Sequence, residues 1–141
     1  MVAYEPGELT LIARAGTPVD QIEQLLAAEG QALAFEPMDH RVLLGSNGTT
    51  TLGGVVAANV SGPRRLQAGA CRDHLLGVRF VDGRGRVIKN GGRVMKNVTG
   101  MDLARLMCGA NGTLGILTEV ALKALPMAES QQTLAFAGVR P

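Results

Sequence analysis

Residues 48–62 read Gly-Thr-Thr-Thr-Leu-Gly-Gly-Val-Val-Ala-Ala-Asn-Val-Ser-Gly, and the expected fold is built around this stretch. Glycine at this density costs conformational entropy, so a tight turn or a close approach of backbone to a ligand should require it. Thr51 before the Gly53-Gly54 pair predicts a loop that enters a short helix. A helix start presents free N–H groups and a positive dipole end, which favour an anionic phosphate or an electron-rich ring edge. Because no basic cluster accompanies the stretch, we expect the backbone to do the binding.

A second glycine-rich stretch, residues 109–118, reads Gly-Ala-Asn-Gly-Thr-Leu-Gly-Ile-Leu-Thr and runs into an apolar strand. The two stretches and the segment between them contain four short motifs. The full order is Thr51-Leu52-Gly53-Gly54, Ala58-Asn59-Val60-Ser61-Gly62, Arg72-Asp73-His74-Leu75-Leu76-Gly77 and Gly112-Thr113-Leu114-Gly115-Ile116-Leu117-Thr118. One glycine pair alone is a weak signal, whereas four ordered motifs are fairly specific.

Together these motifs resemble the FAD-binding module of the vanillyl-alcohol-oxidase/PCMH flavoprotein superfamily, from about Tyr4 to Pro126. Residues 91–100, Gly-Gly-Arg-Val-Met-Lys-Asn-Val-Thr-Gly, are most similar to the FAD-binding E subunits of bacterial glycolate oxidases. The chain departs from that pattern at Met101, where the related segment usually has Tyr. Methionine packs but donates no hydrogen bond, so a polar contact from this position is lost.

The resemblance implies that FAD lies against both glycine-rich stretches. From it we expect the second stretch to form a tight loop whose backbone faces the flavin or adenine. Gly112 and Gly115 would then lack a Cβ because the ligand approaches them closely. The alternative is a turn that feeds the following strand and needs at most one of them. The implied cofactor-binding residues are Thr51, Leu52, Gly53, Gly54, Ala58, Asn59, Val60, Ser61, Gly62, Asn111, Gly112, Thr113, Leu114, Gly115, Ile116 and Leu117.

The implied function is that of a FAD-binding subunit of glycolate oxidase, a flavin-dependent enzyme that oxidises glycolate to glyoxylate. The flavin performs the chemistry in such enzymes, and the protein orients and tunes it. His40 and His74 match no catalytic pattern, so the catalytic residues are left unknown. The implied partners are the flavoprotein and iron–sulfur subunits of the complex. The alternative is a non-catalytic interaction module that keeps the fold and partner surface but binds no flavin alone.

The resemblance also predicts the domain organisation. Residues 1–126 match the second subdomain of a PCMH-type FAD-binding domain, without the earlier subdomain that carries the phosphate loop. Residues 127–141 are expected to be a linker or the start of a cap domain. A module with half of the cofactor cradle exposes an apolar face, which favours a homodimer or a partner, and alone it should be inactive.

Composition excludes several other classes of protein. The chain has 141 residues, 46% hydrophobic and 18% charged, which indicates a folded domain rather than a disordered one. A net charge of +2 from scattered Lys and Arg, with 3% aromatic residues, argues against nucleic-acid binding. A Rossmann NAD enzyme is disfavoured, because no Gly-x-Gly-x-x-Gly motif follows a first strand with an acidic residue at the right distance.

Cys71 and Cys108 form no CxxC and have no His at metal-ligand spacing, so no metal site is expected. They could pair. The start has no basic-plus-hydrophobic leader, and we expect a cytoplasmic protein with reduced thiols that reaches a membrane only through its partners.

The local patterns predict an α+β fold, with a mixed, largely antiparallel sheet flanked by short helices. Expected strands cover residues 9–15, 32–37, 75–81, 86–89 and 116–123, and another begins at 131–137. A helix should begin with Thr17 as N-cap and end at Gly30, and a shorter one should follow Asp102. Residues 38–47 and 63–74 are expected to be loops. Lys96 is expected to pair with Asp102.

Overall fold

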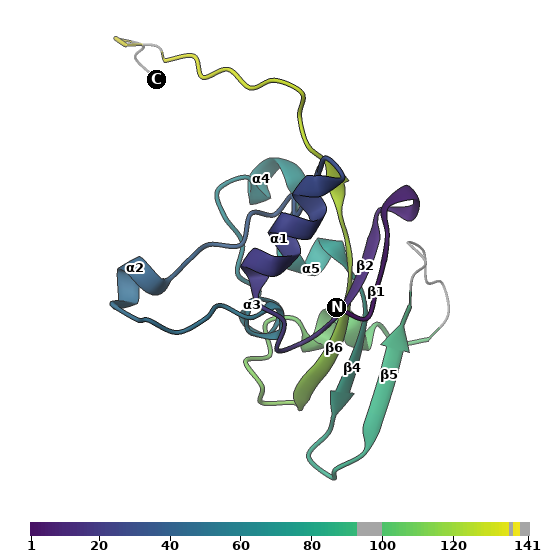
Figure 1. Cartoon of the computed structure of the whole chain (residues 1–141). Helices are drawn as coiled ribbons and strands as arrows, with labels where there is room; N and C mark the ends of the chain where they lie inside the picture. The colour runs from purple at the N-terminus through teal and green to yellow at the C-terminus, as the bar shows by residue number, and fades with distance from the viewer. Residues whose placement is uncertain (93–99, 136, 139–141) are drawn as a thin grey trace.

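The computed structural model describes residues 1–92, 100–135 and 137–138, with short helices against a central sheet (Figure 1). The elements, in chain order, are β1 (Ala3–Glu5), the 3-10 helix η1 (Pro6–Glu8), β2 (Thr10–Arg14), α1 (Val19–Ala28), β3 (Gln31–Ala32), α2 (Arg41–Leu44), α3 (Leu52–Ala58), α4 (Arg65–Ala68), α5 (Cys71–His74), β4 (Leu75–Val81), β5 (Val87–Gly91), α6 (Leu103–Met107), β6 (Ile116–Lys123) and β7 (Leu125–Pro126).

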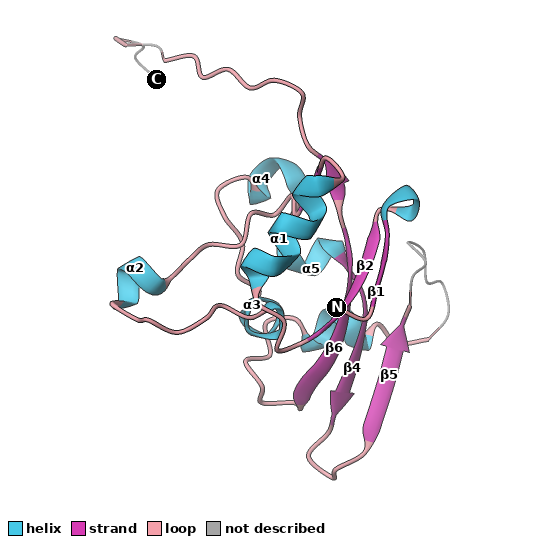
Figure 2. Cartoon of the chain, viewed as in Figure 1, coloured by secondary structure: helices cyan, strands magenta, loops and turns pink. Residues whose placement is uncertain are grey.

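The main sheet has five strands in the order β1-β2-β6-β4-β5, and each pairing between its described strands is antiparallel (Figure 2). A separate two-stranded ribbon joins β3 to β7. The expected α+β class with short flanking helices is therefore confirmed. The last long strand, β6, occupies the centre of the sheet between β2 and β4, so the glycine-rich loop before it enters the middle of the fold.

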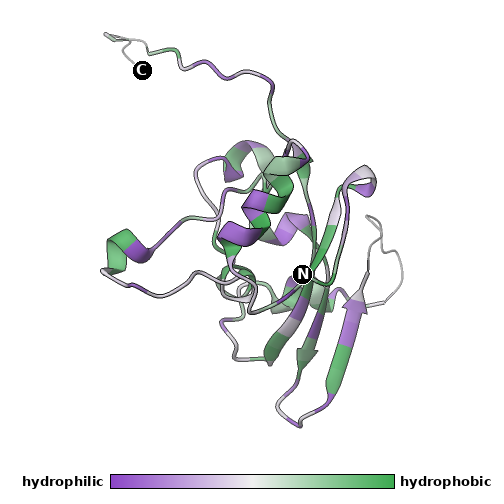
Figure 3. Ribbon diagram, in the orientation of Figure 1, coloured by the Kyte–Doolittle hydropathy of each residue, from purple (hydrophilic) through white to green (hydrophobic). Residues whose placement is uncertain are grey.

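The core lies between the sheet and the helices. Val120 and Leu122 alternate along β6 with more exposed neighbours and are fully buried, as period-two strand geometry requires. On the helical side, α1 buries Val19, Ile22 and Leu26 in the expected stripe. Figure 3 shows hydrophobic colour along parts of the strands and helices, including α2.

Several local expectations are confirmed. The hairpin turn at residues 82–85 joins β4 to β5, and the Asp82 carboxylate accepts the N–H groups of Arg84 and Arg86 at 2.9 Å. Asp102 caps α6 by accepting from the N–H of Arg105 at 3.0 Å. The expected partner of Asp102, Lys96, lies outside the described residues.

Residues 63–74 were expected to be a loop, and that expectation is wrong, because α4 and α5 lie there. The first N–H groups of α5 are satisfied from far away in sequence: Ser61 Oγ accepts from the Cys71 N–H at 2.9 Å, and Asn59 Oδ1 from the Arg72 N–H at 3.1 Å. Such remote caps leave no local signature.

The expected boundaries also change near the N-terminal helix. Pro18, not Thr17, is the N-cap of α1, and no side chain caps it. The strand expected at 32–37 shortens to β3, because the chain turns with Glu36 N–H donating to Leu33 O at 3.0 Å. The described residues of 131–137 form no strand.

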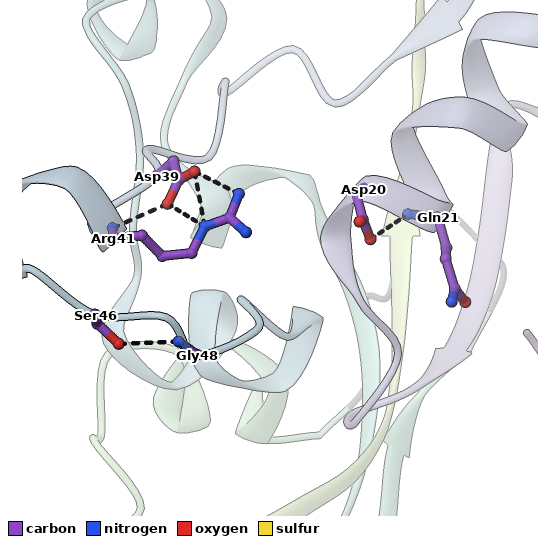
Figure 4. A network of polar contacts seen from close by, with 6 residues as sticks. All are labelled: Asp20, Gln21, Asp39, Arg41, Ser46 and Gly48. Atoms are coloured by element: carbon purple, nitrogen blue, oxygen red, sulfur yellow. Dashed lines mark hydrogen bonds and ion pairs between the residues drawn. The ribbon is translucent and has the colours of Figure 1, made fainter.

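The expected loop 38–47 contains α2, which lies apart from the body on an extended arm (Figure 1). Its Val42, Leu43 and Leu44 side chains are largely exposed. Figure 4 shows the polar contacts at the base of this arm, where the Asp39 carboxylate accepts from the Arg41 guanidinium at 2.6–3.0 Å and from its backbone N–H at 2.9 Å.

Hydrogen bonds from Arg41 lower the pKa of Asp39 to about 2. The ionised contact is therefore present above the ordinary Asp pKa of about 3.9 and is lost as the pH falls through about 2. We expect the Asp39 carboxyl to titrate at about 2 by NMR, and Arg41→Gln to move the midpoint back toward about 3.9. The same midpoint in both proteins would contradict this assignment.

Candidate functional site

A groove of about 330 Å³ lies where the two glycine-rich stretches meet. Its walls come from the end of β2, from α3, from the end of α6 and from the start of β6. None of its lining side chains carries a charge. They are Ala15, Gly16, Thr51, Gly53, Gly54, Ala57, Met107, Gly112, Gly115, Ile116 and Leu117. Residues of both glycine-rich stretches thus line one groove, and their contact with a cofactor stays a prediction.

The N–H groups at the start of α3 are engaged within the protein, which corrects the expectation that they are free. Leu52 N–H donates to Thr17 O at 2.9 Å, and Gly53 N–H donates to Ala15 O at 2.7 Å. The Gly54 N–H donates to Thr51 Oγ1 at 3.3 Å. The groove therefore offers shape and apolar surface rather than a set of unpaired backbone donors.

The C-terminal end of α3 is held by the second glycine-rich stretch. Gly109 N–H donates to Val56 O at 3.0 Å, and Asn111 N–H donates to Ala57 O at 2.8 Å. The bond to Ala57 O satisfies a carbonyl at the end of the helix, and Val56 O also accepts from the Asn59 N–H at 3.1 Å. The bonds from Gly109 and Asn111 fix the two walls of the groove relative to one another.

Gly53 and Gly54 are adjacent but have different reasons to lack a side chain. A Cβ on Gly53 would lie 2.6 Å from Ala15 Cβ and 2.9 Å from Ala15 O, so the contact between α3 and the end of β2 excludes it. A Cβ on Gly54 would meet only Thr51 Oγ1, at 3.3 Å. Gly53 is therefore required by packing, whereas Gly54 leaves the groove open.

Gly112 and Gly115 in the second stretch also have different reasons to lack a side chain. Gly112 has a left-handed φ of 76°, and no atom lies within 4 Å of where its Cβ would be. A Cβ on Gly115 would lie 2.6 Å from Val81 O and 3.0 Å from Phe80 Cδ2, in the neighbouring strand β4. The sheet accounts for Gly115, and the turn accounts for Gly112.

The motif at residues 58–62 has a structural role at the far end of α3. Asn59 adopts a left-handed φ of 52° as the C-cap, and with Ser61 it caps α5. Gly62 N–H donates to Phe35 O at 2.8 Å, and a Cβ there would lie 2.6 Å from Glu36 O. A cofactor contact from these residues stays a prediction.

The other expected site residues lie around the groove rather than in its lining. Leu52 is fully buried in the core, and Ala58 is exposed on α3. In the second stretch, Thr113 Oγ1 donates to Ala110 O at 2.7 Å and so closes the turn. The lining set leaves out Leu52, Ala58, Asn59, Val60, Ser61, Gly62, Asn111, Thr113 and Leu114.

Four lining residues were not expected from the sequence: Ala15, Gly16, Ala57 and Met107. Ala15 and Gly16 directly follow β2, and a pair of small residues at a strand end is the signal that could have identified them. Met107 lies at the end of α6, and nothing in its local sequence distinguishes it from a core methionine.

The described residues provide no acid–base or metal constellation. His74 is buried, with Nε2 donating to Ala68 O at 2.8 Å, while its Nδ1 has no protein partner. In the ranges 1–92, 100–135 and 137–138, no group of three or more His, Cys, Asp or Glu could hold a metal ion. Within those ranges no helix is both long and apolar enough to cross a bilayer.

Comparison with known proteins relates this chain to FAD-binding domains. The family described as "FAD binding domain" matches residues 1–91. The solved structure of an alkyldihydroxyacetonephosphate synthase superposes with a TM-score of 0.68 and 25% identity, over 92% of this chain and 22% of that one.

Curated relatives include two glycolate oxidase subunits. GlcE of Escherichia coli (strain K12) is 44% identical over 134 residues, which cover 95% of this chain and 37% of GlcE. GlcD of Bacillus subtilis (strain 168) is 35% identical over 130 residues, or 92% of this chain and 27% of GlcD. A D-lactate dehydrogenase of Archaeoglobus fulgidus is 33% identical over 124 residues, or 88% of this chain and 26% of that relative. The chain thus spans 37% or less of the length of these proteins.

The division among the glycines predicts a clear order of stability effects. Gly115→Ala should lower the free energy of unfolding by about 1–3 kcal/mol, because its Cβ overlaps β4. Gly112→Ala should lower it by about 1 kcal/mol, from the left-handed φ alone. Urea unfolding measures both, with Gly83→Ala as the control, since no atom lies within 4 Å of a Cβ there. A larger loss for Gly112→Ala than for Gly115→Ala would contradict the packing account.

Proposed function

The chain belongs to the FAD binding domain family, and from this premise we propose that it is the FAD-binding part of a flavin-dependent glycolate oxidase. The proposal rests on one observation above the others: both glycine-rich stretches line a single apolar groove. The identities to GlcE and GlcD support glycolate, oxidised to glyoxylate, as the substrate. We further propose that residues 1–126 act as the second subdomain of the FAD-binding domain, and residues 127–141 as the connection to a cap domain.

The groove fits part of the cofactor. Its lining of glycines, alanines and aliphatic side chains suits a flat, apolar ring system, and Gly112 leaves open space where a Cβ would stand. About 330 Å³ is at the low end for ligand pockets, enough for one ring system rather than a whole dinucleotide. We therefore assign ring contact to this chain and phosphate binding to other parts of the enzyme.

In this proposal a bound flavin would supply the hydride-acceptor chemistry toward the 2-hydroxy acid, and the chain's own residues would position it. Ile116, Leu117 and Met107 supply apolar contact and keep water from the ring. The backbone bonds from Gly109 and Asn111 to α3 hold the walls at a fixed separation. Such preorganisation lowers the cost of ordering the site when the cofactor binds.

A second candidate, a non-catalytic interaction module that holds no flavin alone, is favoured by one specific observation. The N–H groups at the start of α3 already have protein acceptors, so they provide no preformed phosphate site. The two candidates differ in whether the purified chain binds added FAD.

Gly54→Val tests the cofactor site directly. Its branched side chain projects into the groove, so we expect FAD affinity to fall about tenfold or more, equivalent to about 1.4 kcal/mol. Titration of flavin fluorescence measures the affinity, and far-UV circular dichroism checks the fold. Gly83→Val is the matched control, because it makes the same substitution at an exposed turn position outside the groove, where no atom lies within 4 Å of a Cβ.

Equal affinities of wild type and Gly54→Val would remove the groove from the cofactor site. A folded wild-type chain that binds no FAD at all would favour the interaction module.

The proposed partners are the flavoprotein and iron–sulfur subunits of glycolate oxidase. The described residues form no metal cluster, so electrons from a bound flavin would need an acceptor on another chain. Affinity purification of the tagged protein from its native host should recover an iron-containing subunit, measured by mass spectrometry and iron analysis. Recovery of the tagged protein alone, as a symmetric oligomer, would contradict this proposal and favour a homodimer.

A further inference from the structure

The main sheet has a second face that the hydrophobic core does not use. On the inner face, alternate strand residues such as Leu11, Val78 and Val120 pack into the core with side chains of α1, α3 and α6. Figure 2 shows α1 and α3 on that side of the sheet. Successive side chains of a strand alternate, so the residues between these ones form an outer face. A trough of about 430 Å³ lies there, and its lining comes from strand residues and from residues next to strand ends.

A row of four charged side chains crosses this outer face. The strand register pairs Arg14 with Glu119, Glu119 with Arg79, and Arg79 with Lys89. Because paired residues of antiparallel strands project from the same face, the row runs across β2, β6, β4 and β5 in that order. The Arg79 Nε and Glu119 Oε1 atoms are 3.8 Å apart, and their side chains stay partly exposed, at 44% and 22%. Three exposed cations and one carboxylate thus form a fixed pattern of charge.

The floor of the trough is the next row of residues on the same face. The register aligns Ile12, Ala121, Gly77 and Gly91 across the same four strands. A Cβ on Gly77 would lie 2.7 Å from the backbone N of Gly92, so the close pairing of β4 and β5 requires that glycine. The trough is therefore part of the sheet itself, and three members of the charged row also line it.

We propose that the outer face is a docking surface for an acidic amphipathic helix of a partner protein, which lies along the charged row. Neighbouring strands are about 4.8 Å apart, so the four charges span about 14 Å. Positions i, i+3, i+7 and i+10 on one side of a helix have rises of about 0, 4.5, 10.5 and 15 Å, which match this spacing. Carboxylates of the helix face Arg14, Arg79 and Lys89, a cation faces Glu119, and apolar side chains beside them enter the trough.

The mixed signs of the row favour a helix over other occupants. A uniformly anionic nucleic acid or lipid surface would also place negative charge opposite Glu119. A second copy of this chain, related by a two-fold axis, would place Arg14 opposite Lys89. Side chains of a protein helix can match each sign in turn, and such complementarity selects the partner and fixes its register. The proposal is independent of flavin binding, because the trough and the groove share no lining residue.

Covalently stapled helical peptides test the docking surface on the unmodified protein. One peptide carries Glu at i, i+7 and i+10 and Lys at i+3, and a second carries the same pattern in the opposite chain direction, each with a neighbouring leucine stripe. Fluorescence anisotropy should give a Kd below about 100 µM for at least one of them, and added salt should weaken the binding. The matched control has the same composition, with its charged residues on the opposite side of the helix, and should bind at least about tenfold more weakly.

Three results of this experiment would overturn the proposal. They are no saturable binding of either peptide, equal or tighter binding of the control, and tighter binding of an oligothymidylate than of both peptides. The last result would instead make the outer face a nucleic-acid surface.

Protein variants test whether the charged row itself makes the contact. Arg79→Glu should raise the Kd at least about tenfold. Arg65→Glu is the matched control, because it makes the same reversal at an exposed residue of α4 and should leave the Kd unchanged. Glu119→Lys should reverse the preference at one peptide position: wild type favours Lys opposite Glu119, and the variant favours Glu there. Circular dichroism checks that each variant is folded, and an unchanged preference or an unchanged Kd for Arg79→Glu would overturn the proposal.

Discussion

The contact between Gly53 and Ala15 is the constraint on which the rest of the site depends. The Gly53 N–H reaches Ala15 O at 2.7 Å only because no Cβ separates α3 from the end of β2. That approach places α3 beside the sheet, where its C-terminal carbonyls receive the N–H groups of Gly109 and Asn111. Helix, strand end and loop are thus joined by backbone bonds, and the groove is the space that they leave. Side chains contribute its lining but not its framework.

High glycine content at a candidate site has more than one physical cause here. Gly53, Gly62 and Gly115 each lie where a Cβ would overlap another segment of backbone or its attached side chain. A Cβ on Gly54 would meet only the Thr51 hydroxyl, at 3.3 Å, and no backbone, whereas Gly112 has open space there and is accounted for by its left-handed φ alone. Glycines in such a motif can therefore be required by close packing between chain segments as well as by the approach of a ligand. The structure is needed to separate the two.

The sequence predicted the features that are encoded locally. The stripe of α1, the Asp82 hairpin turn and the Asp102 cap are all short-range patterns, and each is found. The α+β class followed from the local strand and helix patterns. What failed depends on distant partners: α5 takes its caps from Asn59 and Ser61, and the donors at the start of α3 take acceptors from the end of β2 and the turn that follows it. Those bonds join residues ten or more positions apart, beyond the span of a local helix-cap or turn pattern.

A groove without charge limits what this chain can contribute to recognition of a dinucleotide. Its apolar lining gains free energy from burying a ring, through the hydrophobic effect and dispersion, but offers nothing to offset the desolvation of a phosphate. Cofactor specificity would then arise from combining this rigid apolar wall with charged or donor groups elsewhere in the enzyme. The same rigidity makes the wall sensitive to its anchoring points, because a shift of Gly109 or Asn111 moves Gly112 with them.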